Sequence, residues 1–90
     1  MTGIESIIKE REKQINKHGY TAQHDSMYKN KELMFAAMAY LNSAMYGAVV
    51  GEEDWPFDED YWHPGSPEDD LAKAAAFIAA ELDRRRENAE

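Results

Sequence analysis

Apolar residues recur at helical spacing in three stretches of the chain. In the first stretch this spacing gathers one set of side chains on a single face: Ile4, Ile7, Ile8, Arg11 and Ile15. Thr2 and Glu5 fit the capping-box pattern, and Gly19 is a suitable stop. The pattern therefore predicts a first helix over residues 4–18. Its opposite face is expected to be solvated surface, formed by Glu10, Glu12, Lys13 and Lys17.

The second stretch is predicted to be a helix over residues 30–46. Asn30 is a good N-cap and Gly47 a good stop. Every residue from Leu33 to Leu41 is hydrophobic, so this helix is apolar nearly all round. Such a helix is buried on several sides, but a three-helix monomer would leave one of its sides exposed. The pattern therefore indicates a homo-oligomer.

The third helix is predicted from Ser66 to about Arg86. Ser66 supplies a hydroxyl cap, and Pro67 occupies the first helical position. One stripe consists of Leu71, Ala75, Ile78 and Leu82, and further alanines coat much of the remaining surface, so that neighbouring helices can approach closely. The basic run 84–86 suits the negative end of the helix dipole, which we favour over a phosphate site.

These elements predict a single all-α domain over residues 1–90, a compact three-helix unit with a connector at 19–29 and a long loop at 47–66. Within that loop, residues 55–64 (the aromatic loop) carry four aromatic rings and three acids. The rings either pin the loop to the core or form the wall of a binding site. Long irregular loops are often functional, although large rings frequently bury for stability alone.

Composition limits the classes of protein to which this chain can belong. The chain has no cysteine, which excludes disulfides and thiolate metal sites and fits a reducing cytoplasm. No apolar run is long enough to span a membrane, and no signal-peptide core is visible. Residues 1–50 hold six Lys and Arg against five acids, whereas residues 51–90 hold four against thirteen. This acidity disfavours direct nucleic-acid binding. It fits simple solubility, or mimicry of nucleic acid toward a basic partner.

Two constellations could carry metal chemistry, and neither is specific. His24 and Asp25 form an adjacent pair without a helical histidine partner, so local turn capping is the simpler interpretation. The acids Glu32, Asp69, Asp70, Glu81 and Asp83 lie on the second and third helices, as in helical nucleotide pyrophosphohydrolases. The paired ExxE and ExxD motifs of those enzymes are incomplete here. We therefore expect no catalytic residue, no metal and no cofactor.

A third constellation suits a planar anionic ligand. Aromatic side chains could stack on such a ligand while cations neutralise its phosphates. The candidate ligand-binding residues are Arg11, His24, Tyr28, Trp55, Trp62 and Lys73. In this hypothesis Arg11 and Lys73 contact phosphate, the rings stack, and His24 donates a hydrogen bond.

The order of motifs along residues 8–86 resembles a group of small proteins of tailed phages and prophages, the Ead-like accessory proteins. The matching segments are Glu10-Arg11-x-x-Gln14-Ile15, Gly19-Tyr20-Thr21-x-x-His24-Asp25, Glu32-Leu33-x-x-Ala36-Ala37-x-x-Tyr40, Trp55-Pro56-Phe57, Trp62-x-Pro64 and Asp70-Leu71-x-Lys73-Ala74-x-x-x-Ile78-x-Ala80-Glu81-Leu82-Asp83-Arg84. The chain departs from the family at Ser26, where a second acid is usual, and at Asn30-Lys31, where a glycine often precedes Glu-Leu.

The resemblance implies a phage or prophage product that acts in the cytoplasm of a bacterial host. Small phage proteins of this kind often counter host immunity. The leading hypothesis is a non-enzymatic homo-oligomer that binds or sequesters a nucleotide-derived immune signal. One alternative is an acidic protein-interaction module that blocks a host protein, and another is a degenerate metal-dependent nucleotide pyrophosphohydrolase.

Overall fold

Helices make up all the regular structure that the computed structural model describes, which covers residues 1–18 and 31–87. The α-helices are α1 (Gly3–His18), α3 (Glu32–Tyr46), α4 (Ala48–Glu52) and α5 (Pro67–Glu87), and a short 3-10 helix, η1, spans Glu59–Tyr61. The all-α prediction is confirmed. None of the helices in these two ranges is long and apolar enough to cross a membrane.

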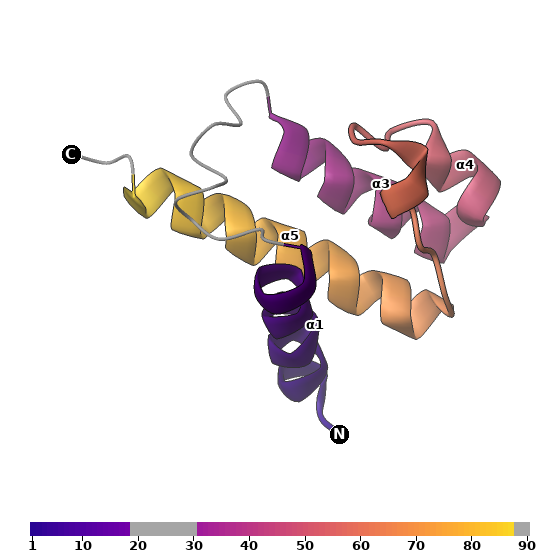
Figure 1. The fold of residues 1–90 in the computed structure, drawn as a ribbon. Coiled ribbons are helices and arrows are strands. Elements are labelled where there is room, and N and C mark those ends of the chain that lie inside the picture. Colours follow the sequence, from indigo (N-terminus) through magenta and orange to yellow (C-terminus); the bar gives the residue numbers. More distant parts are fainter. Residues whose placement is uncertain (19–30, 88–90) are drawn as a thin grey trace.

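The long helix α5 organises the domain (Figure 1). Helix α3 runs beside α5 in the opposite direction, and α4 folds back onto α3. Helix α1 crosses α5 and packs against no other described helix. The core between α3 and α5 consists of Leu33, Ala36, Ala37, Tyr40, Ala74, Phe77 and Ala80. Since four of these seven residues are alanines, the two helices approach closely, as the alanine-rich sequence of α5 predicts.

The helix starts at residues 2 and 66 follow the local sequence. The Thr2 N–H donates to Glu5 Oε1 at 3.0 Å, and the Glu5 N–H donates to Thr2 Oγ1 at 3.2 Å, which completes the predicted capping box. At the start of α5, the Asp69 N–H donates to Ser66 Oγ at 3.1 Å. Both caps are confirmed, because each depends only on residues within one turn.

Helix α3 begins two residues later than predicted. Its N-cap position is Lys31, which has a left-handed backbone (φ 69°) and makes no side-chain capping bond. The expected cap, Asn30, lies outside the described residues. The boundary at the other end is correct, because Gly47, with φ 103°, follows Tyr46 and donates its N–H to Ser43 O.

The loop at 47–66 is more regular than predicted, since it contains α4 and η1. Helix α4 lies very close to α3 at Gly51: a Cβ at this position would overlap Ala39 O and stand 2.8 Å from Ser43 Cβ. A glycine therefore allows α4 to pack tightly on α3. The sequence pattern did not indicate α4, because a helix of five residues depends on this tertiary contact rather than on propensity.

The orientation of α1 also differs from the prediction. Ile4, Ile8 and Ile15 are exposed, whereas Gln14 is buried and Glu10 is half-buried. The side of α1 that carries Arg11 faces α5, where Arg11 Nη2 lies 3.1 Å from Asp83 Oδ2. The predicted solvated face is thus partly covered, and three of the four isoleucines are left at the surface, while Ile7 is half-buried.

Candidate functional site

The aromatic loop is held on the core by a cluster of rings around Tyr40. The Tyr40 ring centroid lies 4.6 Å from that of Trp62, 5.4 Å from that of Trp55 and 6.0 Å from that of Phe77. The Trp55 and Trp62 rings also contact each other, with centroids 5.2 Å apart. Both indoles are half-buried. These rings cover the α3–α5 core, as one of the two interpretations of the loop predicts.

Hydrogen bonds fix the same loop at intervals. Asn42 Nδ2 donates to Asp54 Oδ2 at 2.7 Å just before the loop, and Trp55 Nε1 donates to Asp58 O at 2.9 Å within it. The Asp60 N–H donates to Asp58 Oδ1 at 2.9 Å, which caps η1. The path of the loop is therefore defined by its own contacts, without the need for a ligand.

Lys73 closes the far end of the aromatic loop. Its Nζ donates to His63 O at 2.6 Å and lies 5.5 Å from the centre of the Tyr40 ring. The His63 N–H donates to Tyr40 Oη at 3.1 Å. Lys73, proposed as a phosphate ligand, thus already binds a carbonyl and a ring face.

Burial raises the pKa of the Tyr40 phenol to about 12, opposed by the hydrogen bond from the His63 N–H and reinforced by the charges of Asp70 and Glu10. Ionisation of Tyr40 is therefore less favourable in the folded protein than in the unfolded chain. Its contribution to stability is complete below the ordinary value of 10 and is lost as the pH rises through about 12.

We expect the Tyr40 phenol of the folded protein to ionise near pH 12, in the final alkaline part of an ultraviolet titration of phenolate absorbance. The Tyr40→Phe variant should lack this final step, because the substitution removes that phenol. The same substitution should lower the free energy of unfolding by about 1 kcal/mol, since the His63 N–H loses its acceptor. A final step that persists in Tyr40→Phe would contradict the assignment.

Asp70 anchors the end of the loop to both long helices. Its side chain is buried (1% exposed), and it accepts hydrogen bonds from Ser43 Oγ at 2.8 Å and from the Gly65 N–H at 2.8 Å. The carboxylate therefore links α5 to α3 and to the loop. Sequence reasoning treated it as a first-turn acid or a possible metal ligand and missed this role.

Arg11 lies apart from the ring cluster. It donates to Gln14 Oε1 at 3.3 Å and to Asp83 Oδ2 at 3.1 Å. Lys73 and Asp83 are ten residues apart on α5, which corresponds to about 15 Å along a helix. Of the predicted ligand residues, the structure brings together Trp55, Trp62 and Lys73 and places Arg11 elsewhere. His24 and Tyr28, like Asp25, lie outside the described residues.

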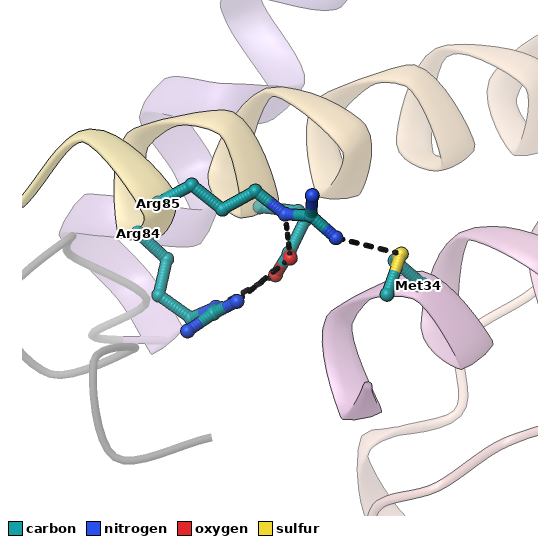
Figure 2. A network of polar contacts seen from close by, with 4 residues as sticks. Met34, Arg84 and Arg85 are labelled. Carbon is teal, nitrogen blue, oxygen red and sulfur yellow. Dashed lines mark hydrogen bonds and ion pairs between the residues drawn. The ribbon is translucent and has the colours of Figure 1, made fainter. Parts of the chain in front are cut away.

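Part of the basic run at the end of α5 binds a buried carboxylate (Figure 2). Glu81 accepts two hydrogen bonds from Arg84, at 2.8 and 2.9 Å, and one from Arg85 at 2.6 Å. Hydrogen bonding by Arg84 and then Arg85, against the effect of burial, lowers the pKa of Glu81 to about 2. Arg85 also reaches across to Met34 Sδ on α3. Arg84 and Arg85 thus both bind a carboxylate of their own helix, and Arg85 also contacts α3, so the predicted role as simple end capping is incomplete.

The surface between Glu52 and Asp69 is strongly acidic. We define the acidic region as the seven exposed acids Glu52, Glu53, Asp58, Glu59, Asp60, Glu68 and Asp69. No Lys or Arg lies between residues 32 and 72 of the chain. The ion pairs found in the described residues use Glu10, Glu81 and Asp83, so none of the seven acids is paired there. In Figure 1, α4, the aromatic loop and the first turn of α5 lie at the same end of the domain.

The carboxylates considered as metal ligands do not converge. Glu81 and Asp83 are bound by arginines, and Asp70 accepts two hydrogen bonds. Within residues 1–18 and 31–87, no three His, Asp or Glu side chains gather as they would around a metal ion.

Tyr40 is the central residue that sequence reasoning did not select. A signal was present: a tyrosine in the middle of an apolar helix needs a partner for its hydroxyl group, which here is the His63 N–H. Together these features define a small all-α domain with a ring-anchored acidic loop. The chain matches no family model, and neither a curated protein nor a solved structure is significantly similar to it.

Proposed function

We propose that the protein is a non-enzymatic interaction module whose acidic region binds a basic surface of another protein. The observation that carries the proposal is that the seven exposed acids have no ion-pair partner in the described part of the chain while their backbone is held in place. Complementary charge steers association and selects the partner. A loop that is ordered before binding also loses less conformational entropy on binding.

Exposed apolar side chains next to these acids support a protein partner. Tyr46 and Val49 lie just before Glu52, and Tyr61 directly follows the acids of η1; all three side chains are exposed. Protein interfaces combine such aromatic and apolar contacts with charged surroundings. The resemblance to phage accessory proteins makes the partner a basic protein of the bacterial host, met in its cytoplasm.

The double charge reversal Glu53→Lys with Glu59→Lys is expected to weaken binding of that partner about tenfold or more, because it replaces attraction by repulsion. Both side chains are exposed and neither makes a hydrogen bond to the described part of the chain, so stability should change little. The partner would first be captured from host lysate on the immobilised protein. Its affinity for each variant would then be measured by surface plasmon resonance at two salt concentrations.

A matched control is Glu12→Lys with Glu87→Lys, which changes the net charge equally at exposed positions on α1 and α5. Affinity should stay within about twofold of the original, apart from a weak long-range effect that salt screens. If both double variants bind equally well, the acidic region is not the binding surface.

Binding of a nucleotide-derived signal remains a second candidate. It is supported by the grouping of Trp55, Trp62 and Lys73 around Tyr40, which puts half-exposed rings next to a cation. Isothermal titration of the folded protein against cyclic and linear nucleotides tests it. Heat that disappears in Lys73→Met would support this candidate, and the absence of heat with every nucleotide would exclude it.

A further inference from the structure

An apolar stripe runs along the exposed side of α5. Leu71, Ile78 and Leu82 are 50%, 54% and 50% exposed, and Ala75 lies between them. On one side of this stripe lie the residues buried toward α3, Asp70, Ala74, Phe77 and Glu81. On its other side lie the buried alanines Ala72 and Ala76. The stripe is therefore a face of the organising helix that has no partner within residues 1–18 and 31–87.

The spacing of the stripe is the same in both directions along the helix. Its members are separated by four, three and four residues. Two copies of α5 in antiparallel contact, related by a two-fold axis, would place Leu71 against Leu82 of the second copy. Ala75 would likewise meet Ile78 of the second copy. Such self-complementarity is what a two-fold interface requires.

The charges beside the stripe favour the same arrangement. Glu68 precedes Leu71 by three residues and Arg86 follows Leu82 by four, which places both charges on the same flank of the helix. Both side chains are exposed, and Arg86 forms no ion pair in the described part of the chain, in contrast to Arg84 and Arg85. Antiparallel pairing brings Glu68 next to Arg86 of the second copy on the same flank of the interface, whereas parallel pairing would keep these two charges at opposite ends of the interface.

We infer that the protein forms a homodimer in which the Leu71–Leu82 face of α5 packs antiparallel against the same face of a second copy. The exposed side of α3, with Phe35, Met38, Leu41 and Met45, is also apolar, but its charged residues, Lys31 and Glu32, both lie at its N-terminal end, so its C-terminal end carries no charge to complete an antiparallel pair. A single helix pair buries less than a standard interface of about 800 Å² per partner, so we expect dissociation in the micromolar range. This inference does not depend on the proposed function.

The first test is sedimentation velocity of the full chain over a concentration series. The original protein should pass from monomer to dimer, and Ile78→Glu should weaken the dimer at least about 100-fold, because it buries an unpaired charge. Met38→Glu on α3 is the matched control and should leave the dimer unchanged. A monomer at all concentrations, or a dimer lost only in Met38→Glu, would overturn the inference. Circular dichroism would establish that each variant is folded.

The second test reports the register directly. Because the chain contains no cysteine, any disulfide must form between the introduced residues. In the antiparallel pair the two Ala75 positions are offset by about 4–5 Å along the axis, whereas the two Leu71 positions are about 16 Å apart. Ala75→Cys should therefore oxidise to a cross-linked dimer and Leu71→Cys should not, given the short reach of a disulfide. A mixture of Leu71→Cys and Leu82→Cys should cross-link as a heterodimer. Efficient self-linking of Leu71→Cys would instead indicate parallel pairing.

The third test exchanges the flanking charges. Glu68→Arg and Arg86→Glu should each weaken the dimer, and the double variant should recover it, because the pair between copies is restored with reversed sign. Additive losses in the double variant would refute the pairing of these two residues. A monomeric result in these experiments would leave the binding of a basic partner unaffected, since that assay uses Glu53 and Glu59, although Glu68 belongs to both surfaces.

Discussion

Replacing Asp70 with alanine is expected to lower the free energy of unfolding by about 3 kcal/mol, because Ser43 Oγ and the Gly65 N–H would lose their shared acceptor in a buried position. In a domain of this size that is a large fraction of the total stability. Chemical denaturation followed by circular dichroism measures the change. The substitution should loosen both the packing of α3 against α5 and the attachment of the end of the aromatic loop.

The control is the neighbouring acid. Asp69→Ala removes an exposed carboxylate from the same helix turn, so it should cost less than about 1 kcal/mol through the helix dipole. The two substitutions change the net charge equally, which separates the hydrogen-bonding role of Asp70 from its charge. Equal losses for both variants would mean that the buried hydrogen bonds do not stabilise the fold.

Trp62→Ala is expected to lower the free energy of unfolding by about 3 kcal/mol, since the indole packs on Tyr40 and belongs to the layer that covers the core. The loss should be measurable without any ligand. Chemical denaturation of the purified protein is the appropriate assay, and near-ultraviolet circular dichroism would show the loosening of the ring cluster.

The adjacent residue provides the comparison. Tyr61 is exposed, and its side chain has no ring partner among the described contacts, so Tyr61→Ala should change stability by no more than about 0.5 kcal/mol. If Trp62→Ala were as mild as Tyr61→Ala, the ring layer would not hold the loop. The tryptophans would then have to be explained by ligand binding, and the nucleotide titration would become the decisive experiment.

Some of the candidate site could be predicted from the chain and some could not. The grouping of Trp55 and Trp62 follows from their closeness in sequence and from the ring-rich loop. Arg11 could not be placed in the same way, because its position depends on Asp83, which is 72 residues away. The importance of Asp70 depends on the convergence of α3, α5 and the loop, which no local pattern reveals. Tyr40 carries a local signal, but its partner, the His63 N–H, is set only by the fold.

The sequence by itself determined that this protein is helical, where α1 and α5 begin, and that its second half is acidic. These properties depend on residues within a turn of one another or on composition alone, so no knowledge of the fold is needed. Only the tertiary structure decided which faces are covered: it left Ile4, Ile8 and Ile15 of α1 exposed, buried Asp70 and left the α5 stripe open. The reason is that burial of a side chain depends on the surface that a neighbouring element presents to it. In this protein those surfaces include the Arg11–Asp83 contact, the alanine faces of α5 and the ring of Tyr40.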